Sequence, residues 1–554
     1  MTGQHRPRRP KGGPRPATNQ PSADQTPGDQ PPADRPTADR PTADQPPADR
    51  PPADRPPGDR PTADQPRADR PPAATAPADP RRAPRASAGR APAGRSPAPK
   101  TTGKASAPKA PQLRAPASDP PRQTAYDVLA AVRERSAYAN LVLPGLLRER
   151  RLDARDAALA TELAYGTLRA QGQLDVVLQA CVDRPLAQVD PPVLDLLRLG
   201  AYQLLRTRVP PHAAVSATVD LARRVTTAGP AAFVNAVLRK VSAKDLDTWL
   251  TELAPDEEVA ALGLATSHPR WIASAFRDAL RGDLDEAREA LLADDARPEV
   301  HLVARRMPRD ELVALSGGAP GPWSDRAVRL PAGSPGDLAP VRDGRAGVQD
   351  EGSQLVALAL AAAPVEGPDR LWVDVCAGPG GKASLLQQVA DERGARLLAL
   401  EVQPHRARLV RSSGVRDVVV ADSRQLPVAD GTADRVLLDA PCSGLGALRR
   451  RPEARWRRQP SDLPPLTRLQ GDLLAAAVAA LRPGGVLLYA TCSPHLAETV
   501  VPVADVLRRH PELEQVDARP LLPGVPELGD GPAVQLWPHR HGTDAMFLAL
   551  LRRR

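Results

Sequence analysis

Lysine is scarce in this chain of 554 residues. Only seven of its 75 basic residues are lysine, so arginine accounts for most of the basic charge and for the formal net charge of +9. Arginine enrichment also follows from a GC-rich coding bias, and the charge alone is therefore a weak argument for a nucleic-acid partner. Lys382 is the only lysine after residue 244, which makes it a position of interest.

Cysteine and long apolar runs are scarce as well. The four cysteines are Cys181, Cys376, Cys442 and Cys492, and no two have CxxC spacing. This excludes a disulfide framework and argues against a structural zinc site. The longest apolar run, 355–365, is too short to span a bilayer, and the N-terminus lacks an apolar signal core. We therefore expect a soluble, cytoplasmic, monomeric protein without metal or membrane contact.

Residues 1–122 are dominated by Pro, Ala, Asp and Arg. A five-residue unit such as PTADR runs ten times from Pro21 to Arg70, and large apolar residues are absent from it. Because nothing offsets the entropy of ordering, we predict a disordered, extended tail. Its basic flanks suit loose contact with RNA; a solvated tail without a specific partner is the simpler interpretation.

Helical periodicity predicts an all-α domain over 123–255. Its expected helices cover 124–147, 154–170, 173–181, 192–205, 213–225 and 231–241. A small α+β segment follows over 256–345, with helices to 279 and over 285–293, a strand over 298–305 and loops over 317–336.

The pattern over 346–554 predicts an α/β, Rossmann-like domain. A strand, a Gly-rich turn and a helix occupy 371–390, and glycine there permits close approach of the backbone to a ligand. The next strands end on Glu401, Asp422, Asp439 and Cys492. An acid at the end of the second strand suits a ribose hydroxyl pair. The turn is neither GxGxxG nor a P-loop, which weakens the interpretation as an NAD or ATP site. A sheet with an acid at the end of its second strand fits S-adenosylmethionine as well as NAD.

Two short apolar runs each stop on a turn that carries a cysteine, LLDAPCSGLG (437–446) and LLYATCSP (487–494). Functional groups of open α/β sheets collect at the carboxyl ends of strands, so both thiols are expected to face one crevice. The alternative is that both are small buried hydrophobes.

These motifs together carry a resemblance to a known family. DVCAGPGGK (374–382), DAPCSGLG (439–446) and ATCSP (490–494) resemble the Sun/Fmu (RsmB) family of 16S rRNA cytosine-5 methyltransferases. The helical segments YANLVL (138–143) and FVNAVLRK (233–240) resemble its NusB-like RNA-binding domain, and 256–345 would be its RNA-guiding subdomain. The chain departs from the family pattern at Gly378, where Ala is common, and at Ala545-Met546, where Gly-Phe is usual.

The resemblance implies a role for each motif residue. Cys492 would be the nucleophile that adds to C6 of cytosine, Cys442 would help release the product, and Asp439 would lie between cofactor and base. Lys382 would meet the carboxylate of S-adenosyl-L-methionine, and Asp422 the adenine side. The cofactor-binding set would be Cys376, Ala377, Gly378, Pro379, Gly380, Gly381, Lys382, Glu401, Asp422 and Asp439.

Arginines cluster directly after the first cysteine turn, in LRRRPEARWRRQ (448–459). Guanidiniums there suit RNA phosphates and a tryptophan suits base stacking, although a solvated basic helix is the alternative. The predicted RNA-binding residues are Arg449, Arg450, Arg451, Arg455, Trp456, Arg239 and Lys240, with Arg169 as a further exposed candidate.

The sequence therefore predicts an S-adenosylmethionine-dependent enzyme that methylates 16S rRNA, or another structured RNA, at C5 of a cytosine. A tRNA cytosine-5 methyltransferase stays open as an alternative, because the catalytic motifs do not name the RNA. A non-catalytic RNA-binding or antitermination factor built on the NusB-like domain is the other alternative.

Overall fold

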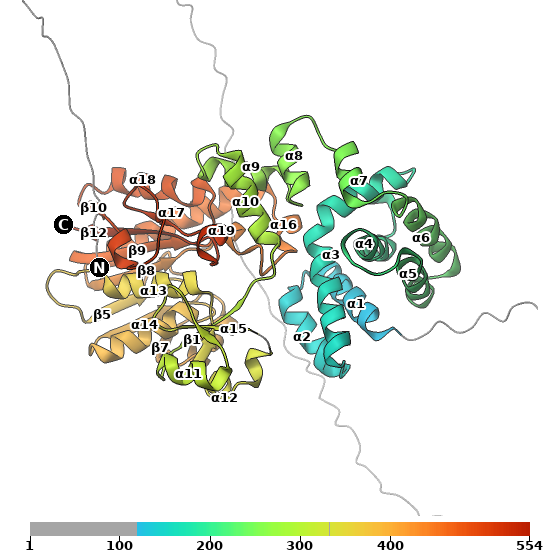
Figure 1. Ribbon diagram of the computed structural model, residues 1–554. Coiled ribbons are helices and arrows are strands. Elements are labelled where there is room, and N and C mark those ends of the chain that lie inside the picture. The colour runs from blue at the N-terminus through green and yellow to red at the C-terminus, as the bar shows by residue number, and fades with distance from the viewer. Residues whose placement is uncertain (1–118, 332) are drawn as a thin grey trace, which may run out of the picture. The chain divides into compact units, whose positions relative to one another are not determined.

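The computed structural model describes residues 119–331 and 333–554. The predicted disordered tail lies outside these residues, apart from 119–122, where helix α1 begins (Figure 1). Asp119 caps this helix by accepting a hydrogen bond from the backbone N–H of Arg122, and proline follows at the first helical position. Within the described part of the chain, no helix combines the length and the hydrophobicity needed to cross a membrane.

The first domain is all-α, as predicted, and has its own hydrophobic core. Its helices are α1 (Pro120–Arg135), α2 (Ala139–Glu149), α3 (Ala154–Cys181), α4 (Pro191–Arg206), α5 (Pro211–Val225), α6 (Ala228–Val241) and α7 (Leu246–Glu252).

One predicted helix of this domain is divided in the structure, and two others are joined. The expected helix over 124–147 is two helices, because Ser136 adopts a left-handed conformation with φ of 50°. The two helices expected over 154–181 are the single helix α3, which continues through Gly172. A Cβ atom at position 172 would lie 2.4 Å from the Trp456 ring, so glycine here allows that ring to pack against the helix.

The middle segment contains helices and an antiparallel sheet in the order β2-β3-β1-β4. The strand predicted over 298–305 is confirmed, but the expectation of loops over 317–336 is wrong in part, because β2 and β3 pair there. The elements are α8 (Glu258–Ala265), α9 (Arg270–Ala279), α10 (Leu284–Asp295), β1 (Val300–Ala304), α11 (Arg309–Ser316), β2 (Ala319–Pro320), β3 (Ala327–Leu330), α12 (Ala339–Arg342) and β4 (Ala346–Val348).

The last part is an α/β domain around a largely parallel sheet in the order β10-β12-β9-β8-β5-β6-β7. Strands β5 to β9 pair in parallel, whereas β12 runs antiparallel between β9 and β10. The strands are β5 (Leu371–Asp374), β6 (Arg396–Leu400), β7 (Asp417–Val419), β8 (Ala433–Asp439), β9 (Leu481–Thr491), β10 (Leu513–Val516), β11 (Val534–Gln535), which pairs with β12, and β12 (Phe547–Arg553).

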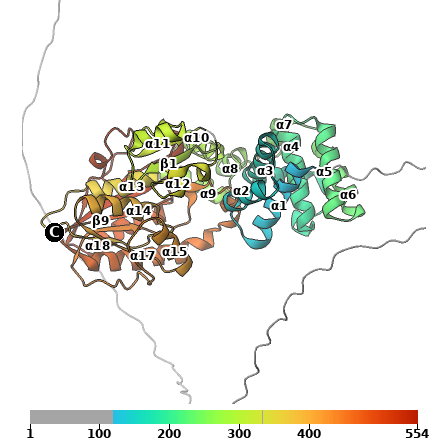
Figure 2. The same ribbon diagram turned by 90° about the horizontal axis from the view of Figure 1, so that it is seen from below.

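Helices cover both faces of this sheet. On one face α13 (Glu351–Ala362), α14 (Gly381–Glu392) and α15 (Pro404–Ser412) share a core with the strands. On the other face α17 (Leu463–Ala480) and α18 (Val500–Arg509) do so, and Figure 2 shows β9 between the two layers. The short helices α16 (Ala454–Arg457) and α19 (Pro538–His541) lie in connections. Strand order reverses between β5 and β8, which places a ligand crevice at the carboxyl ends of these strands.

Candidate active site

The two cysteine turns meet at the carboxyl ends of two neighbouring strands. Strands β8 and β9 are parallel, with Asp439 opposite Ala490, so the turn that follows each strand lies at the same edge of the sheet. The Sγ atoms of Cys442 and Cys492 are 3.4 Å apart, and neither residue is fully buried. The expectation that both sulfurs face one crevice is confirmed. The turns are also joined through the backbone, because Gly446 N–H donates to the Cys492 carbonyl (2.9 Å).

The two thiols differ in acidity. A hydrogen bond from Cys442 lowers the pKa of Cys492, and the cation of Lys382 acts in the same direction against the opposing effects of burial and Asp439. The same bond, together with burial and the charges of Cys492 and Glu498, raises the pKa of Cys442 well above its usual range. Of the two thiols, Cys492 is thus the one that ionises more readily, which is the property that a nucleophilic cysteine needs.

A lysine–aspartate pair lies beside the sulfurs. Lys382 Nζ donates to Asp439 Oδ2 (2.8 Å), and the attraction of Asp439 raises the pKa of Lys382 although burial acts the other way. Asp374, at the end of β5, is buried, and burial and the Asp439 charge raise its pKa to about 7. That Lys382 meets the cofactor's carboxylate stays a prediction; in this structure its ammonium group contacts Asp439.

The Gly-rich turn between β5 and α14 lies directly against Glu401. A Cβ atom at Gly378 would lie 1.9 Å from Glu401 Oε2, so an alanine there would require the glutamate to move. Gly380 has φ of 111°, a conformation that side chains other than hydrogen rarely adopt. The departure at Gly378 therefore bears on the ligand site, because it sets the space available to this carboxylate.

Two acids that follow strands line the same hollow. Glu401, after β6, is buried, accepts the Gln403 N–H (2.8 Å) and has Arg406 Nε at 3.5 Å. Asp422, beyond β7, is half-exposed, and its hydrogen bonds from Arg424 lower its pKa to about 2. Both side chains are thus available as acceptors for donors of a bound nucleoside.

The crevice has a volume of about 820 Å³. One part is lined by the Gly-rich turn and the two acids, and the other by Asp439, the cysteines and the segment that carries Arg451. A turn that approaches a ligand through glycine and a buried carboxylate that could accept from ribose hydroxyls fit S-adenosyl-L-methionine, which would supply a methyl group. Cys376 and Pro379 also line the crevice.

Several predicted RNA contacts are instead structural. Arg449 and Arg450 both form ion pairs with Asp350 and Asp544. Arg455 is fully buried and pairs with Asp295. These three side chains are buried or half-buried in ion pairs, so the expectation that they are exposed to RNA phosphates is wrong. Their acidic partners lie far away in the sequence, so the local pattern of basic residues does not reveal them.

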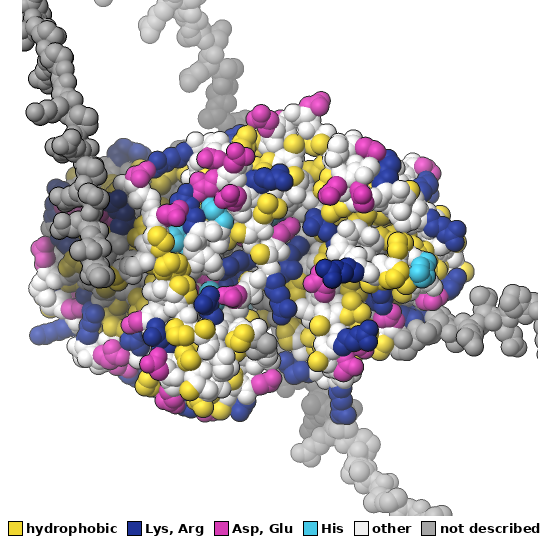
Figure 3. Space-filling view, in the orientation of Figure 1, with side chains coloured by type: hydrophobic (Ala, Val, Ile, Leu, Met, Phe, Trp, Pro, Cys, Tyr) yellow, Lys and Arg dark blue, Asp and Glu magenta, His cyan; other side chains and the backbone are white. Residues whose placement is uncertain are grey.

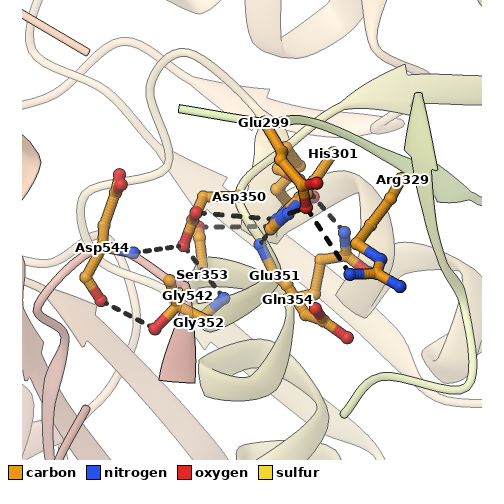
Figure 4. A network of polar contacts seen from close by, with 12 residues as sticks. Glu299, His301, Arg329, Asp350, Glu351, Gly352, Ser353, Gln354, Gly542 and Asp544 are labelled. Carbon is orange, nitrogen blue, oxygen red and sulfur yellow. Dashed lines mark hydrogen bonds and ion pairs between the residues drawn. The ribbon is translucent and has the colours of Figure 1, made fainter. Parts of the chain in front are cut away.

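Asp350 is the centre of that ion-pair cluster. Figure 4 shows its carboxylate between Asp544, whose N–H donates to it (3.1 Å), and His301. The carboxylate also accepts the Gly352 N–H (2.9 Å), which caps α13. Burial opposes ionisation, but Arg450, Arg449 and His301 together lower the pKa of Asp350 to about 2. The segment after Cys442 is thereby fastened to the start of α13.

Trp456 is held by the helical domain. Its indole Nε1–H donates to the Leu168 carbonyl (2.9 Å), and its ring packs on Gly172. The ring is half-buried, and base stacking by Trp456 stays a prediction. Arg169, expected to be exposed, is half-buried, and burial lowers its pKa.

Three of the predicted basic residues remain at the surface. Arg239 and Lys240 are exposed at the end of α6. Arg451 is exposed, lines the crevice and lies over the ring of Tyr138 at 5.0 Å. On the face shown in Figure 3 basic and acidic side chains are interspersed, so single residues at the crevice are a better guide to RNA contact than overall charge.

Glu498 and Ser443 are not among the site residues predicted from the sequence. Glu498 is fully buried and accepts hydrogen bonds from the backbone N–H and the hydroxyl of Ser443, the residue after Cys442. The only signal in the sequence was the acid's position six residues after Cys492, which by itself identifies no partner.

Comparisons with known proteins show which family the chain resembles. Residues 359–552 match the family described as 16S rRNA methyltransferase RsmB/F, and residues 119–243 match the NusB family. The protein Rv1407 of Mycobacterium tuberculosis (strain ATCC 25618 / H37Rv) is 55% identical over 452 residues, which cover 78% of this chain and 97% of that protein. Ribosomal RNA small subunit methyltransferase B of Pseudomonas putida is 34% identical over 413 residues, which cover 72% and 91%.

A solved structure shares the fold. The crystal structure of PH0851 superposes with a TM-score of 0.67 at 22% identity, covering 79% of this chain and 100% of that one. The identity and coverage of the sequence relatives, the match over the catalytic domain and the match over the helical domain lead to one conclusion. The chain belongs to the RsmB/F family of RNA methyltransferases and carries a NusB-like domain ahead of the catalytic one.

Proposed function

We propose that this enzyme transfers a methyl group from S-adenosyl-L-methionine to C5 of a cytosine in 16S rRNA, through a covalent bond between Cys492 and C6. The observation that carries the proposal is the cysteine pair. Two thiols 3.4 Å apart, with pKa values shifted in opposite directions, lie at the end of the crevice beyond the Gly-rich turn.

The chemistry requires a nucleophile because C5 of cytosine is a poor one. When bound, the cofactor supplies an electrophilic methyl group on a sulfonium. The Cys492 thiolate adds to C6, and C5 becomes enamine-like and takes the methyl group. A general base then removes the C5 proton, the C5–C6 double bond forms again and the Cys492 thiolate leaves. Cys442, whose thiol stays protonated, assists the release of the product.

The remaining residues bind and orient. Asp439, held by Lys382, contacts the edge of the cytosine after the base has left its stack. Residues Cys376 to Lys382 surround the methionine part of the cofactor, Glu401 accepts from the ribose hydroxyls and Asp422 faces the adenine. Arg451, Arg239 and Lys240 contact RNA phosphates. The enzyme acts as a monomer in the cytoplasm, where thiols stay reduced.

The choice of 16S rRNA rests on the names of the relatives, which are ribosomal RNA small subunit methyltransferases. Bisulfite sequencing of rRNA and tRNA from a deletion strain, compared with the same strain carrying the wild-type gene, tests it. Loss of one 5-methylcytosine from 16S rRNA is expected. Loss from a tRNA would favour the alternative substrate, and no loss from either would favour a non-catalytic RNA-binding role.

A further inference from the structure

A buried carboxylate joins the two cysteine turns from behind. Glu498 is fully buried in the short helical turn that precedes α18. Its Oε1 accepts the backbone N–H of Ser443 (2.8 Å), and its Oε2 accepts the Ser443 hydroxyl. Gln470 donates to Glu498 (3.3 Å) and to the carbonyl of Pro441 (2.8 Å). The residues on both sides of Cys442 are thus held by one group of side chains.

The second turn is tied to the same carboxylate through a pair of hydroxyls. Ser443 Oγ and Ser493 Oγ are 3.1 Å apart, and both residues are buried. Because the Ser443 hydroxyl proton points to Glu498, Ser493 is the donor in this contact. The chain Glu498–Ser443–Ser493 therefore runs parallel to the contact between the two sulfurs, one residue further along each turn.

A carboxylate suits this position better than an amide. Both of its oxygens accept from donors of Ser443, whereas a glutamine would present an N–H group to one of them. Leaving a buried donor unsatisfied is costly, so the carboxylate selects one arrangement of the turn. Its negative charge also contributes to the raised pKa of Cys442.

We propose that Glu498 is a positioning residue that holds the Cys442 and Cys492 turns at the sulfur spacing on which the reaction depends. The inference rests on the proposed function for its catalytic meaning. The placement of the thiols is a property of the free enzyme and is measurable without RNA or cofactor.

The test compares E498Q and S443A with wild type by alkylation. Iodoacetamide modification of Cys492 and Cys442 is followed against pH in the free, full-length enzyme by peptide mass spectrometry. In wild type we expect Cys492 to be modified at lower pH than Cys442. We expect E498Q to reduce the difference in pH between the modification of Cys492 and that of Cys442, mainly because Cys442 reacts at lower pH. We also expect kcat for methyl transfer to fall about 100-fold, with the KM for S-adenosyl-L-methionine unchanged. S443A, which keeps the backbone donor, should reduce this pH difference less.

E351Q is the matched control. Glu351 is another buried carboxylate that accepts two backbone N–H groups, those of Trp323 and Ser324, and it lies outside the cysteine turns. Loss of the Glu351 carboxylate should lower the melting temperature without changing the pH difference between modification of Cys492 and of Cys442. Each variant is first shown by melting to be folded. If this pH difference is unchanged in the folded variants, the inference is overturned, whatever happens to activity. If E498Q does not fold, S443A alone decides. A reduced pH difference in an enzyme that does not methylate cytosine would refute the proposed function, but the positioning of the two cysteine turns by Glu498 would stand.

Discussion

Cys442 and Cys492 lie in turns 50 residues apart in sequence, yet their Sγ atoms are 3.4 Å from one another. Each thiol is the strongest single influence on the pKa of the other, lowering that of Cys492 and raising that of Cys442. The proposed roles of Cys492 as nucleophile and of Cys442 as a protonated thiol follow from this relationship, and their consequences can be measured.

The pH dependence of methyl transfer follows from the Cys492 thiolate. The rate should rise with pH through the pKa of Cys492, and because that pKa is lowered, the midpoint should lie below 9.0, the usual value for a thiol. Removing the hydrogen bond in C442A should shift the midpoint to higher pH. Single-turnover rates across pH measure this, since they do not depend on product release. A midpoint that C442A leaves unchanged would show that Cys442 does not tune the nucleophile.

Glu401 should determine cofactor affinity. Truncation in E401A removes a buried charged acceptor for hydroxyl donors, with an expected loss of ~1.5–3 kcal/mol of binding free energy, or roughly 10- to 100-fold. Calorimetric titration with S-adenosyl-L-methionine measures the change. D422N is the comparison, because Asp422 is half-exposed and already paired with Arg424, and its effect should be smaller. Equal effects, or none at Glu401, would place the ribose elsewhere.

Arg451 and Arg450 are adjacent but should respond differently to substitution. R451A removes an exposed cation at the crevice and should weaken RNA binding and reduce the salt slope by about 1. R450A leaves Asp350 and Asp544 short of a partner in a largely buried cluster and should cost roughly 3 kcal/mol of unfolding free energy.

Salt-dependent RNA binding and chemical denaturation separate the two effects. R508A, at an exposed position of α18, is the control for both and should stay within roughly 0.5 kcal/mol of wild type. A reduced salt slope in R450A with full stability would reverse the assignment.

Stability at low pH should depend on Asp350. Its pKa is about 2 in the folded chain against an ordinary 3.8, so it stabilises the fold above pH 3.8 and this contribution is lost as the pH falls toward 2. The contribution is on the order of 2 kcal/mol. Denaturant unfolding between pH 5 and 2, within the range where refolding is reversible, should show a smaller acid-dependent loss in D350N. D310N, at an exposed position, should follow wild type; a D350N curve of wild-type shape would contradict the account.

The sequence predicted well which residues meet at this edge of the sheet, because parallel strands impose it. Each run of apolar residues in the second half ends on a polar or cysteine residue, and the carboxyl ends of parallel strands share one edge, so Glu401, Asp439 and Cys492 had to lie near one crevice. The meeting of the two sulfurs follows from the same rule, since β8 and β9 are neighbours.

The roles of the arginines could not be predicted from the sequence as well. Arg449, Arg450 and Arg455 form a local basic pattern that suits phosphate, but their partners Asp350, Asp544 and Asp295 lie 94 or more residues away in sequence. A pattern of one sign within ten residues contains no information on such partners. Glu498 was missed for a related reason, because an isolated acid gains meaning only from the donors that surround it.

The covalent step is tested most directly by trapping. C442A is incubated with the RNA and S-adenosyl-L-methionine, separated under denaturing conditions and digested for mass spectrometry. The account predicts an RNA–protein species that persists in C442A, with Cys492 bonded to a methylated cytosine, and no such species in C492A, which should retain cofactor binding but lose methyl transfer. Methyl transfer by C492A at the wild-type rate, or an adduct at a residue other than Cys492, would contradict it.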